Sequence, residues 1–284
     1  MTMHEYHFDM VGLHMVLRTP EPITISNNLQ PFLCPAKPNA DCTVAVHSCA
    51  VLPVSEGPGY DNGPDCYRYA DGTLRIYHGD QAHGEPFAVT QFAKGGQIEI
   101  FVLPEFLSAF SGTSGIFNRI GMENLLLQHQ GLLLHASLIE YAGKTIAFAG
   151  PSGVGKSTQA ALWNTCEHAN ILNGDRAALR LQESVWHAYG SPYAGTSGIY
   201  CQTGAQLAAI VVLEQAEENS LQRLSPTQAL SRIYPEISIH RWDSTFTQQA
   251  ADLCLQLVQH TPVLLLKCKP DPSAVELLKK GLSL

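Results

Sequence analysis

A run of nine residues in the middle of the chain has the types and spacing that bind the phosphates of a nucleotide. It reads Gly-Pro-Ser-Gly-Val-Gly-Lys-Ser-Thr and matches the pattern G-x-x-x-x-G-K-[ST] without a mismatch. In this pattern the glycines let successive backbone N–H groups converge on phosphate oxygens, the lysine reaches the β- and γ-phosphates, and the serine hydroxyl ligates Mg²⁺. The residues predicted to bind the nucleotide are Gly150, Pro151, Ser152, Gly153, Val154, Gly155, Lys156, Ser157 and Thr158. The sequence therefore predicts that the chain binds ATP with Mg²⁺.

A second candidate is the carboxylate of Asp175, which follows the short apolar stretch 170–172. A carboxylate at a strand end beside the loop could hold Mg²⁺ together with Ser157, or accept a proton from a hydroxyl nucleophile. The alternative is an ordinary turn of the Asn-Gly-Asp sequence, held by a local side chain. A phosphate-binding loop alone does not separate a kinase from a GTPase or an ATPase. The chain has neither an N-K-x-D guanine-binding motif nor a long apolar strand ending in Asp-Glu.

The elements around these residues alternate between strands and helices. Apolar strands are expected at 132–139, 145–149, 170–172, 207–213 and 263–266, and helices at 156–163, 226–234 and 244–259. The Gly-rich run thus lies between a strand and a helix, the context in which it binds phosphate. A last helix should begin after Asp271 as N-cap with Pro272 at its first position, and end just before Gly281. Strands alternating with helices favour an α/β nucleotide-binding core.

The first part of the chain has a different pattern and a different charge. Residues 1–124 carry 6 Lys and Arg against 13 Asp and Glu, whereas residues 125–284 carry 11 against 12. Two hairpins are expected in the first part, one at 66–78 around Asp-Gly and one at 86–104 around Gly-Gly. Helix is expected only after Pro104, chiefly at 116–130. We therefore predict a β-rich domain at 1–124 that recognises a substrate or mediates assembly, and an ATP-binding domain at 125–284.

Composition excludes several classes of protein. The chain has 284 residues and a formal net charge of −8, which argues against a general nucleic-acid binder. No apolar run approaches the ~18 residues of a membrane-spanning helix, and the polar, acid-containing N-terminus does not resemble a signal peptide. The eight cysteines form no C-x-x-C pair, so neither a structural zinc site nor a disulfide framework is expected. We expect a cytoplasmic protein with reduced thiols that does not act on membranes. The chain could form a homo-oligomer.

Residues around the Gly-rich run resemble the C-terminal kinase domain of HPr kinase/phosphorylase, a member of the same structural group as phosphoenolpyruvate carboxykinase. The resemblance is carried by Leu-Leu-Leu-His135-Ala-Ser, a strand, and Gly-Pro-Ser-Gly-Val-Gly-Lys-Ser-Thr. It covers residues 130–270, closely around the loop and loosely beyond it. It implies an α/β P-loop kinase core with mixed sheets, preceded here by a smaller β-rich domain. It also implies a catalytic site of Asp175, His135 and Lys156, with Ser157 and Asp175 as metal ligands.

The sequence departs from that family at two positions. Gly174 stands where the family has the first acid of an Asp-Asp pair, and Ala194 stands where it has an arginine. Only one carboxylate is then left to serve as metal ligand and base, and the reverse phosphorylase activity and recognition of HPr lose their support. Arg176 could neutralise charge on the phosphoryl group or form a surface ion pair. His135 could equally be an ordinary core histidine.

The resulting hypothesis is a kinase that transfers the γ-phosphoryl group of ATP to a hydroxyl, preferably a serine, of a peptide, protein or small molecule. Catalysis would rest on positioning and on charge neutralisation by Mg²⁺, Lys156 and backbone amides. One alternative is a regulatory nucleotide-binding module with weak or no turnover. Another is an ATP hydrolase or a relative of the carboxykinase. The sequence does not identify the phosphate acceptor.

Overall fold

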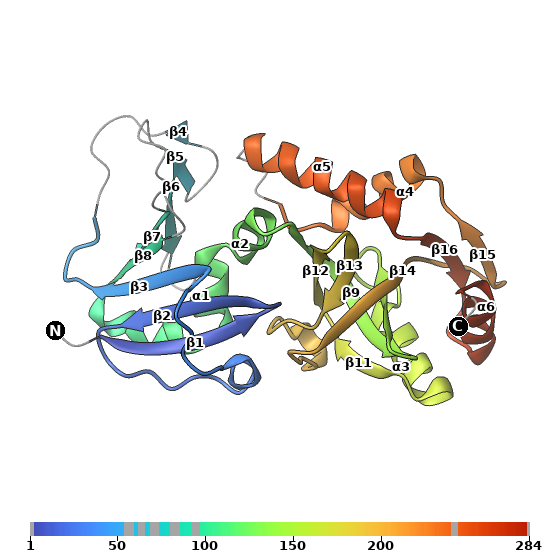
Figure 1. The fold of residues 1–284 in the computed structure, drawn as a ribbon, viewed down its shortest axis with the longest axis horizontal. Coiled ribbons are helices and arrows are strands. Elements are labelled where there is room, and N and C mark those ends of the chain that lie inside the picture. The colour runs from blue at the N-terminus through green and yellow to red at the C-terminus, as the bar shows by residue number, and fades with distance from the viewer. Residues whose placement is uncertain are drawn as a thin grey trace. The chain divides into compact units, whose positions relative to one another are not determined.

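The structure is a computed structural model that describes residues 3–53, 60–61, 66–68, 74–79, 86–92, 97–239 and 244–282. The chain divides into two compact units, Met1–Met122 and Glu123–Leu284. Each unit contains its own mixed sheet, shown in Figure 1 with the first unit coloured blue to green. The fold is therefore of the mixed α/β class.

The sheet of the first unit has eight described strands in the order β1-β2-β3-β8-β7-β6-β5-β4. Their bounds are β1 His4–Met10, β2 Leu13–Thr19, β3 Cys42–Ser48, β4 Tyr60–Asp61, β5 Cys66–Arg68, β6 Leu74–Gly79, β7 Pro86–Phe92 and β8 Gln97–Val102. The strand β3 pairs in parallel with both β2 and β8, and the remaining pairs are antiparallel. Alternate residues of β3 are buried, as Val44 and Val46 show, because successive side chains point to opposite faces.

Both predicted hairpins have the expected strand pairing. Strand β5 pairs antiparallel with β6, and β7 pairs antiparallel with β8. The turn residues 71–72 and 95–96 lie outside the described residues.

The prediction of one helix at 116–130 is wrong. The chain forms α1 at Thr113–Ile120 and α2 at Met122–Gln128, because Gly121 adopts a left-handed φ of 62° that ends α1.

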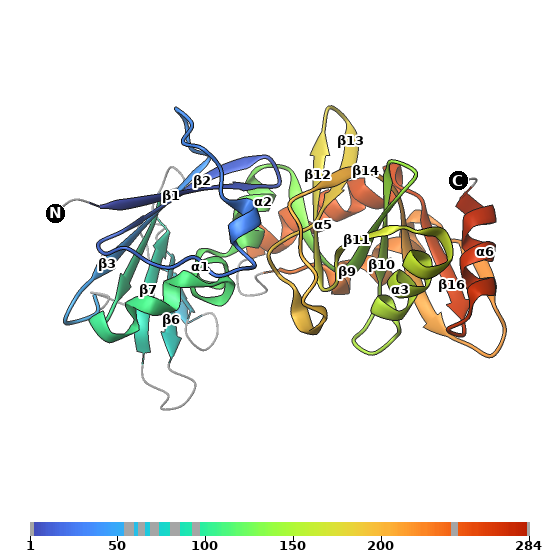
Figure 2. The same ribbon diagram turned by 90° about the horizontal axis from the view of Figure 1, so that it is seen from below.

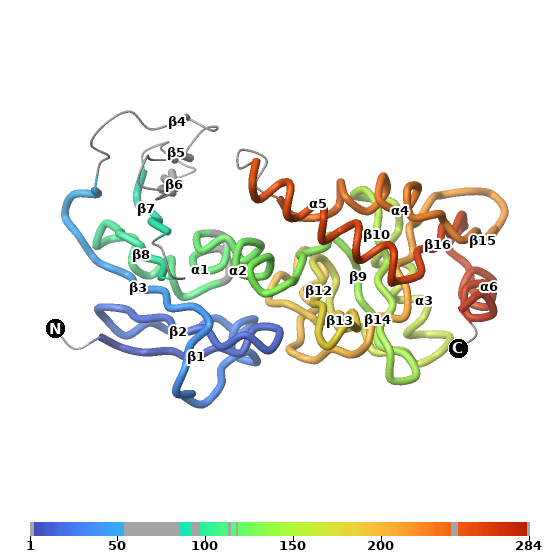
Figure 3. Tube along the Cα trace, turned by 45° about the horizontal axis from the view of Figure 1, so that its top comes forward, coloured from blue at the N-terminus to red at the C-terminus, as the bar shows by residue number. Residues whose placement is uncertain are grey.

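The sheet of the second unit has the order β10-β9-β12-β13-β14-β16-β15, with β11 also paired to β9 and β10 also paired to β14. Its strands are β9 Gly131–Tyr141, β10 Lys144–Ala149, β11 Asn170–Asn173, β12 Arg176–Gln182, β13 Val185–Tyr189, β14 Gly204–Gln215, β15 Ser220–Arg223 and β16 Val263–Cys268. The long strand β9 pairs with β12 along its first half and with β10 and β11 along its second half. Figure 3 shows β9 between β12 and β10. Strand β9 thus connects the strand that precedes the Gly-rich run with the strand that follows Asp175.

Helices of the second unit cover both faces of its sheet (Figures 1 and 2). They are α3 Lys156–Glu167, α4 Pro226–Ile233, α5 Ser244–His260 and α6 Pro272–Leu282, with short 3₁₀ turns at Gly195–Ser197 and Tyr234–Glu236. One buried cluster joins α4 and α5 to one face of the sheet, and a second cluster joins α3 and α6 to the other. The alternation along β10 explains this, because Ile146 and Phe148 belong to one cluster and Ala147 and Ala149 to the other.

The predicted elements of the second unit exist, with differences at their ends. All five predicted strands and the helices at 156–163, 226–234 and 244–259 are confirmed within a few residues. The expected end of the last helix is wrong, because α6 continues through Gly281 to Leu282. Strands β12, β13 and β15 were not predicted from the sequence.

In the described part of the chain, no helix combines the length and apolarity needed to cross a membrane.

Candidate functional site

The Gly-rich loop (residues 150–155) joins β10 to α3, and its glycines take conformations that other residues avoid. Gly150, Gly153 and Gly155 have φ of 138°, 81° and 113°. A Cβ at Gly153 or Gly155 would have no atom within 4 Å, so a side chain would fit in space at both positions. Glycine is favoured there because of the positive φ. The predicted strand–loop–helix context of this run is therefore present.

The N-terminus of α3 is open to a ligand. Its N-cap is Gly155, and no side chain caps it. The first N–H groups of a helix have no partner within the helix, and the helix dipole adds positive potential there. Ser157 and Thr158 in this first turn are exposed, as are Pro151 and Ser152 in the loop. Phosphate oxygens are the ligands that such a terminus binds best.

Lys156 is buried, with 7% of its surface exposed, and its side chain folds back over the loop. Its Nζ donates to Gly150 O at 2.7 Å and to Pro151 O at 3.1 Å. Burial lowers the pKa of the Lys156 ammonium, whereas the negative charges of Glu236 and Asp175 act in the opposite direction. The charges of these two carboxylates therefore stabilise the ammonium form of Lys156.

A cavity of about 600 Å³ adjoins the loop. It is lined by Gly153, Val154, Gly155, Thr158, Gln159, Gln215, Ala216, Glu217, Cys268, Lys269 and Pro270. Gln159 is only 2% exposed, and its Nε2 donates to Cys268 Sγ at 3.2 Å. Its Oε1 has no hydrogen-bond partner among the described residues. A buried acceptor without a donor is destabilising, and the burial of Oε1 also closes it off from the cavity.

The turn that carries Asp175 is held by Asn173, whose side chain is fully buried. Asn173 Oδ1 accepts from the backbone N–H of Asp175 at 2.8 Å and of Arg176 at 2.7 Å. Its Nδ2 donates to the carbonyl oxygens of Ser191 and Tyr193. The turn anticipated as the alternative to a functional acid thus exists. Since Asn173 supplies its side chain, the carboxylate of Asp175 remains available.

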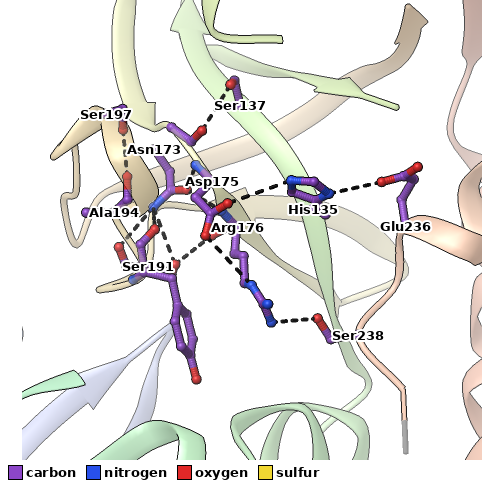
Figure 4. Close-up of polar contacts among 12 residues, drawn as sticks. His135, Ser137, Asn173, Asp175, Arg176, Ser191, Ala194, Ser197, Glu236 and Ser238 are labelled. Atoms are coloured by element: carbon purple, nitrogen blue, oxygen red, sulfur yellow. Dashed lines mark hydrogen bonds and ion pairs between the residues drawn. The ribbon is translucent and has the colours of Figure 1, made fainter. Parts of the chain in front are cut away.

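Asp175 lies in a polar cluster of five side chains, which we call the carboxylate cluster: His135, Asp175, Arg176, Glu236 and Ser238 (Figure 4). Asp175 Oδ1 is 3.7 Å from His135 Nε2, and its Oδ2 is 3.8 Å from Arg176 Nε. His135 Nδ1 is 3.1 Å from Glu236 Oε2, and Arg176 Nη1 donates to Ser238 Oγ at 3.1 Å. The predicted residues His135 and Asp175 are therefore brought together.

The space beside Gly174 is filled by the 195–198 loop. A Cβ at Gly174 would stand 2.5 Å from Ser197 Cβ and overlap its Oγ, and a Cβ at Gly195 would stand 2.7 Å from Asp175 Cβ. Ser197 Oγ donates to Ala194 O at 2.7 Å. The 195–198 loop thus packs directly against the turn that carries Asp175, at the place where the family resemblance implies a second acid.

Sequence reasoning missed Glu236 and Gln159. Glu236 is the most consequential, and it is 101 residues from its partner His135, so no local pattern could connect them. Gln159 has a weak signal, since it is a polar residue on the inner side of an otherwise regular helix. Glu214, near the end of β14, lies outside this cluster and pairs with Lys267 at 2.9 Å and Arg232 at 3.7 Å.

The donor set suits Mg²⁺ bound together with phosphates better than a metal bound by the protein alone. Among the described residues, no three His, Cys, Asp or Glu side chains gather into a metal site. Mg²⁺ commonly takes one or two protein oxygens and fills its shell with water and phosphate oxygens. The half-buried carboxylate of Asp175 and the exposed hydroxyl of Ser157 are oxygen donors of that kind.

Comparisons with known proteins give one family and a set of distant structural neighbours. The family model of the SynChlorMet cassette protein ScmC matches residues 122–268. The structure of the Hpr(Ser) kinase/phosphatase from Coxiella burnetii matches 52% of this chain and 95% of its own, at 11% sequence identity and a TM-score of 0.33. That likeness is too remote to bear on activity. A search of the curated proteins finds no match.

Proposed function

The chain belongs to the SynChlorMet cassette protein ScmC family, and we propose that it is an ATP-dependent phosphotransferase. In this proposal it transfers the γ-phosphoryl group, with Mg²⁺, to a hydroxyl of a peptide, protein or small molecule. The observation that carries the proposal is that β9 brings the Gly-rich loop and Asp175 together. Ala136 of β9 pairs with Ala149, the residue before the loop, and the N–H of Ala136 donates to Asp175 O at 2.9 Å. The charges of Asp175 and Glu236 also act on the pKa of Lys156.

The loop would bind the phosphates through the backbone N–H groups at the start of α3 and through Lys156. The lysine now bonds two neutral carbonyl oxygens, those of Gly150 and Pro151. Ionised phosphate oxygens form stronger hydrogen bonds with an ammonium than carbonyl oxygens do. Replacement of the two carbonyl oxygens by phosphate oxygens as hydrogen-bond partners of Lys156 therefore favours nucleotide binding.

Asp175 would act where the γ-phosphoryl group is transferred. Together with Ser157 it offers oxygens to Mg²⁺, which neutralises phosphate charge when bound. Arg176 forms an ion pair with this carboxylate and holds it in place, and His135 lies on its other side. A carboxylate held in this way can also orient the attacking hydroxyl.

The cavity beside the loop would take the nucleoside part of the substrate. Its volume of about 600 Å³ is within the range of small-molecule sites. Gln159 and Gln215 are polar side chains of its lining that would contact the base.

The test is nucleotide binding followed by transfer. We expect millimolar MgATP to raise the melting temperature of the wild-type protein, because a ligand that binds only the native state stabilises it. Lys156→Ala should lose most of that shift. Lys144→Ala is the matched control, since Lys144 is an exposed lysine at the start of β10 and should leave the shift unchanged. No shift with the wild-type protein would overturn the proposal.

Transfer is then measured with γ-labelled ATP in single turnover against candidate hydroxyl acceptors. The second candidate function, a regulatory nucleotide-binding module, is favoured by Gly174, which leaves Asp175 without an acidic neighbour in the turn. A nucleotide-dependent shift without transfer to any acceptor, including water, would select that function.

A further inference from the structure

The segment Glu236–Ser238 lies beside β9, although it is distant from β9 in sequence. Ile237 forms an isolated antiparallel bridge with Leu134, and Ser238 N–H donates to Leu133 O at 2.9 Å. Ile237 is buried, with 4% of its surface exposed. These contacts fix the backbone on both sides of Ile237. They therefore also fix the positions from which the side chains of Glu236 and Ser238 extend.

Each side chain that contacts Asp175 finds its second partner in this segment (Figure 4). His135 faces Asp175 with Nε2 and Glu236 with Nδ1. Arg176 faces Asp175 with Nε and donates from Nη1 to Ser238 Oγ. The segment thus orients both neighbours of the carboxylate without touching the carboxylate itself.

Glu236 decides which ring nitrogen of a neutral His135 carries the hydrogen. Its Oε2 is 3.1 Å from Nδ1, within hydrogen-bond distance, whereas Asp175 Oδ1 is 3.7 Å from Nε2, beyond it. An ionised carboxylate can only accept, so Nδ1 must be the donor. The side chain of Glu236 is only 14% exposed, so water competes weakly for this bond.

We propose that Glu236 is a positioning residue that holds His135 in the Nδ1–H tautomer, so that His135 Nε2 and Asp175 Oδ1 together accept a hydrogen bond from one incoming hydroxyl group. In that tautomer the Nε2 lone pair faces a carboxylate oxygen, and two acceptors repel each other until a donor enters between them. The attacking hydroxyl of phosphoryl transfer is such a donor. The inference rests on the proposed function for the identity of this hydroxyl, but the tautomer itself does not depend on it.

The first test observes the tautomer in the ligand-free protein. Long-range ¹H–¹⁵N NMR of the histidine rings, at a pH where the imidazole is neutral, should show His135 with hydrogen on Nδ1. Glu236→Leu removes the acceptor at similar volume, and the hydrogen should move to Nε2, where Asp175 attracts it. Glu236→Gln keeps an acceptor oxygen and should keep most of the Nδ1–H form.

Ser238→Ala is the matched control, because it removes the other polar side chain of the same segment without touching His135. It should leave the tautomer unchanged. A wild-type ring with hydrogen on Nε2 would overturn the inference, as would a Glu236→Leu ring that stays in the Nδ1–H form. The wild-type measurement decides even if Glu236→Leu does not fold.

The second test measures transfer of the labelled phosphoryl group to water, the simplest hydroxyl donor, in single turnover. A wrong histidine tautomer can cost up to about 10⁴-fold in turnover where the imidazole must accept. Glu236→Leu should therefore slow transfer by about 10²-fold or more while the MgATP-induced melting shift is kept, and Glu236→Gln should restore most of the rate. A rate unchanged in Glu236→Leu contradicts the positioning role. A wild-type protein with the expected tautomer but no nucleotide-induced shift would contradict the proposed function and leave the tautomer finding in place.

Discussion

The Gly-rich loop and the carboxylate cluster are two halves of one candidate site, but the chain builds them in opposite ways. The loop comes from consecutive residues between β10 and α3, and its shape follows from glycines at positive φ. The cluster takes His135 from β9, Asp175 and Arg176 from the turn into β12, and Glu236 and Ser238 from a segment after α4. The comparison teaches that a Gly-rich loop can be built locally while the carboxylates of the same candidate site depend on the packing of distant strands.

The two halves also differ in how their charges are compensated. Lys156 is buried, and its ammonium donates hydrogen bonds to carbonyl oxygens of its own loop. These hydrogen bonds need no residue from the rest of the sheet. Asp175, His135 and Arg176 are all partly exposed, and the charge of Asp175 is compensated by the side chain of Arg176. We therefore expect substitutions in the cluster to change transfer more than binding, and substitutions in the loop to change both.

The largest expected effect is that of Asp175→Asn on transfer. The amide keeps the shape of the carboxylate but loses the charge, so single-turnover transfer should fall by about 10²–10⁴-fold. The MgATP-induced melting shift should change little, because the loop amides and Lys156 remain. The control is Glu214→Gln, at a strand end where the acid pairs with Lys267 instead. If Asp175→Asn transfers at the wild-type rate, the catalytic role of Asp175 is wrong.

Next in size is the effect of Lys156→Ala, which should impair both steps. Loss of one charged donor to the transferred group costs about 10²–10³-fold in turnover. Nucleotide stabilisation should fall too, from about 2.7 kcal/mol at a ligand concentration of 100 times Kd. Calorimetric melts at several MgATP concentrations measure this loss. Equal shifts in the variant and the wild type would show that the loop does not bind the γ-phosphate through Lys156.

A smaller effect is expected from Gly174→Asp, which restores the acid that the family resemblance implies. The new Cβ would collide with Ser197, so we expect a loss of about 1–3 kcal/mol in the free energy of unfolding, as for other overpacked sites. Adding Ser197→Gly should recover most of it, because the colliding hydroxymethyl group is removed. Denaturant unfolding of the single and double variants measures the difference. Equal stability of both variants would contradict this account of the departure at Gly174.

The smallest effect on stability is expected from Gln159→Leu. The substitution removes a buried acceptor that has no donor, so the free energy of unfolding should stay within about 1 kcal/mol of wild type or rise. The affinity for ATP should nevertheless fall relative to that for inorganic tripolyphosphate, because only ATP carries a base. Calorimetric titration with both ligands measures that ratio. An unchanged ratio would remove Gln159 from the nucleoside site.

Much of the secondary structure of the second unit could be predicted, because strands such as 145–149 and helices such as 244–259 have strong hydrophobic patterns. The failures have local causes. Gly121 breaks the helix expected at 116–130, and Gly281 is accommodated inside α6. Strand β12 was missed, since Arg-Ala-Ala-Leu-Arg-Leu-Gln has no strong strand signal and becomes a strand by pairing with β9.

The sequence by itself determined the Gly-rich loop, because a glycine conformation, a lysine and a helix N-terminus are properties of neighbouring residues. It also marked Asp175 and His135 as candidates, although it left each with a structural alternative. Only the tertiary structure decided that these two side chains meet, that Ser197 fills the space beside Gly174, and that Glu236 orients His135. The physical reason is that such contacts join strands and segments far apart in the chain, and their geometry is set by sheet register and core packing. No local pattern of residues encodes that geometry.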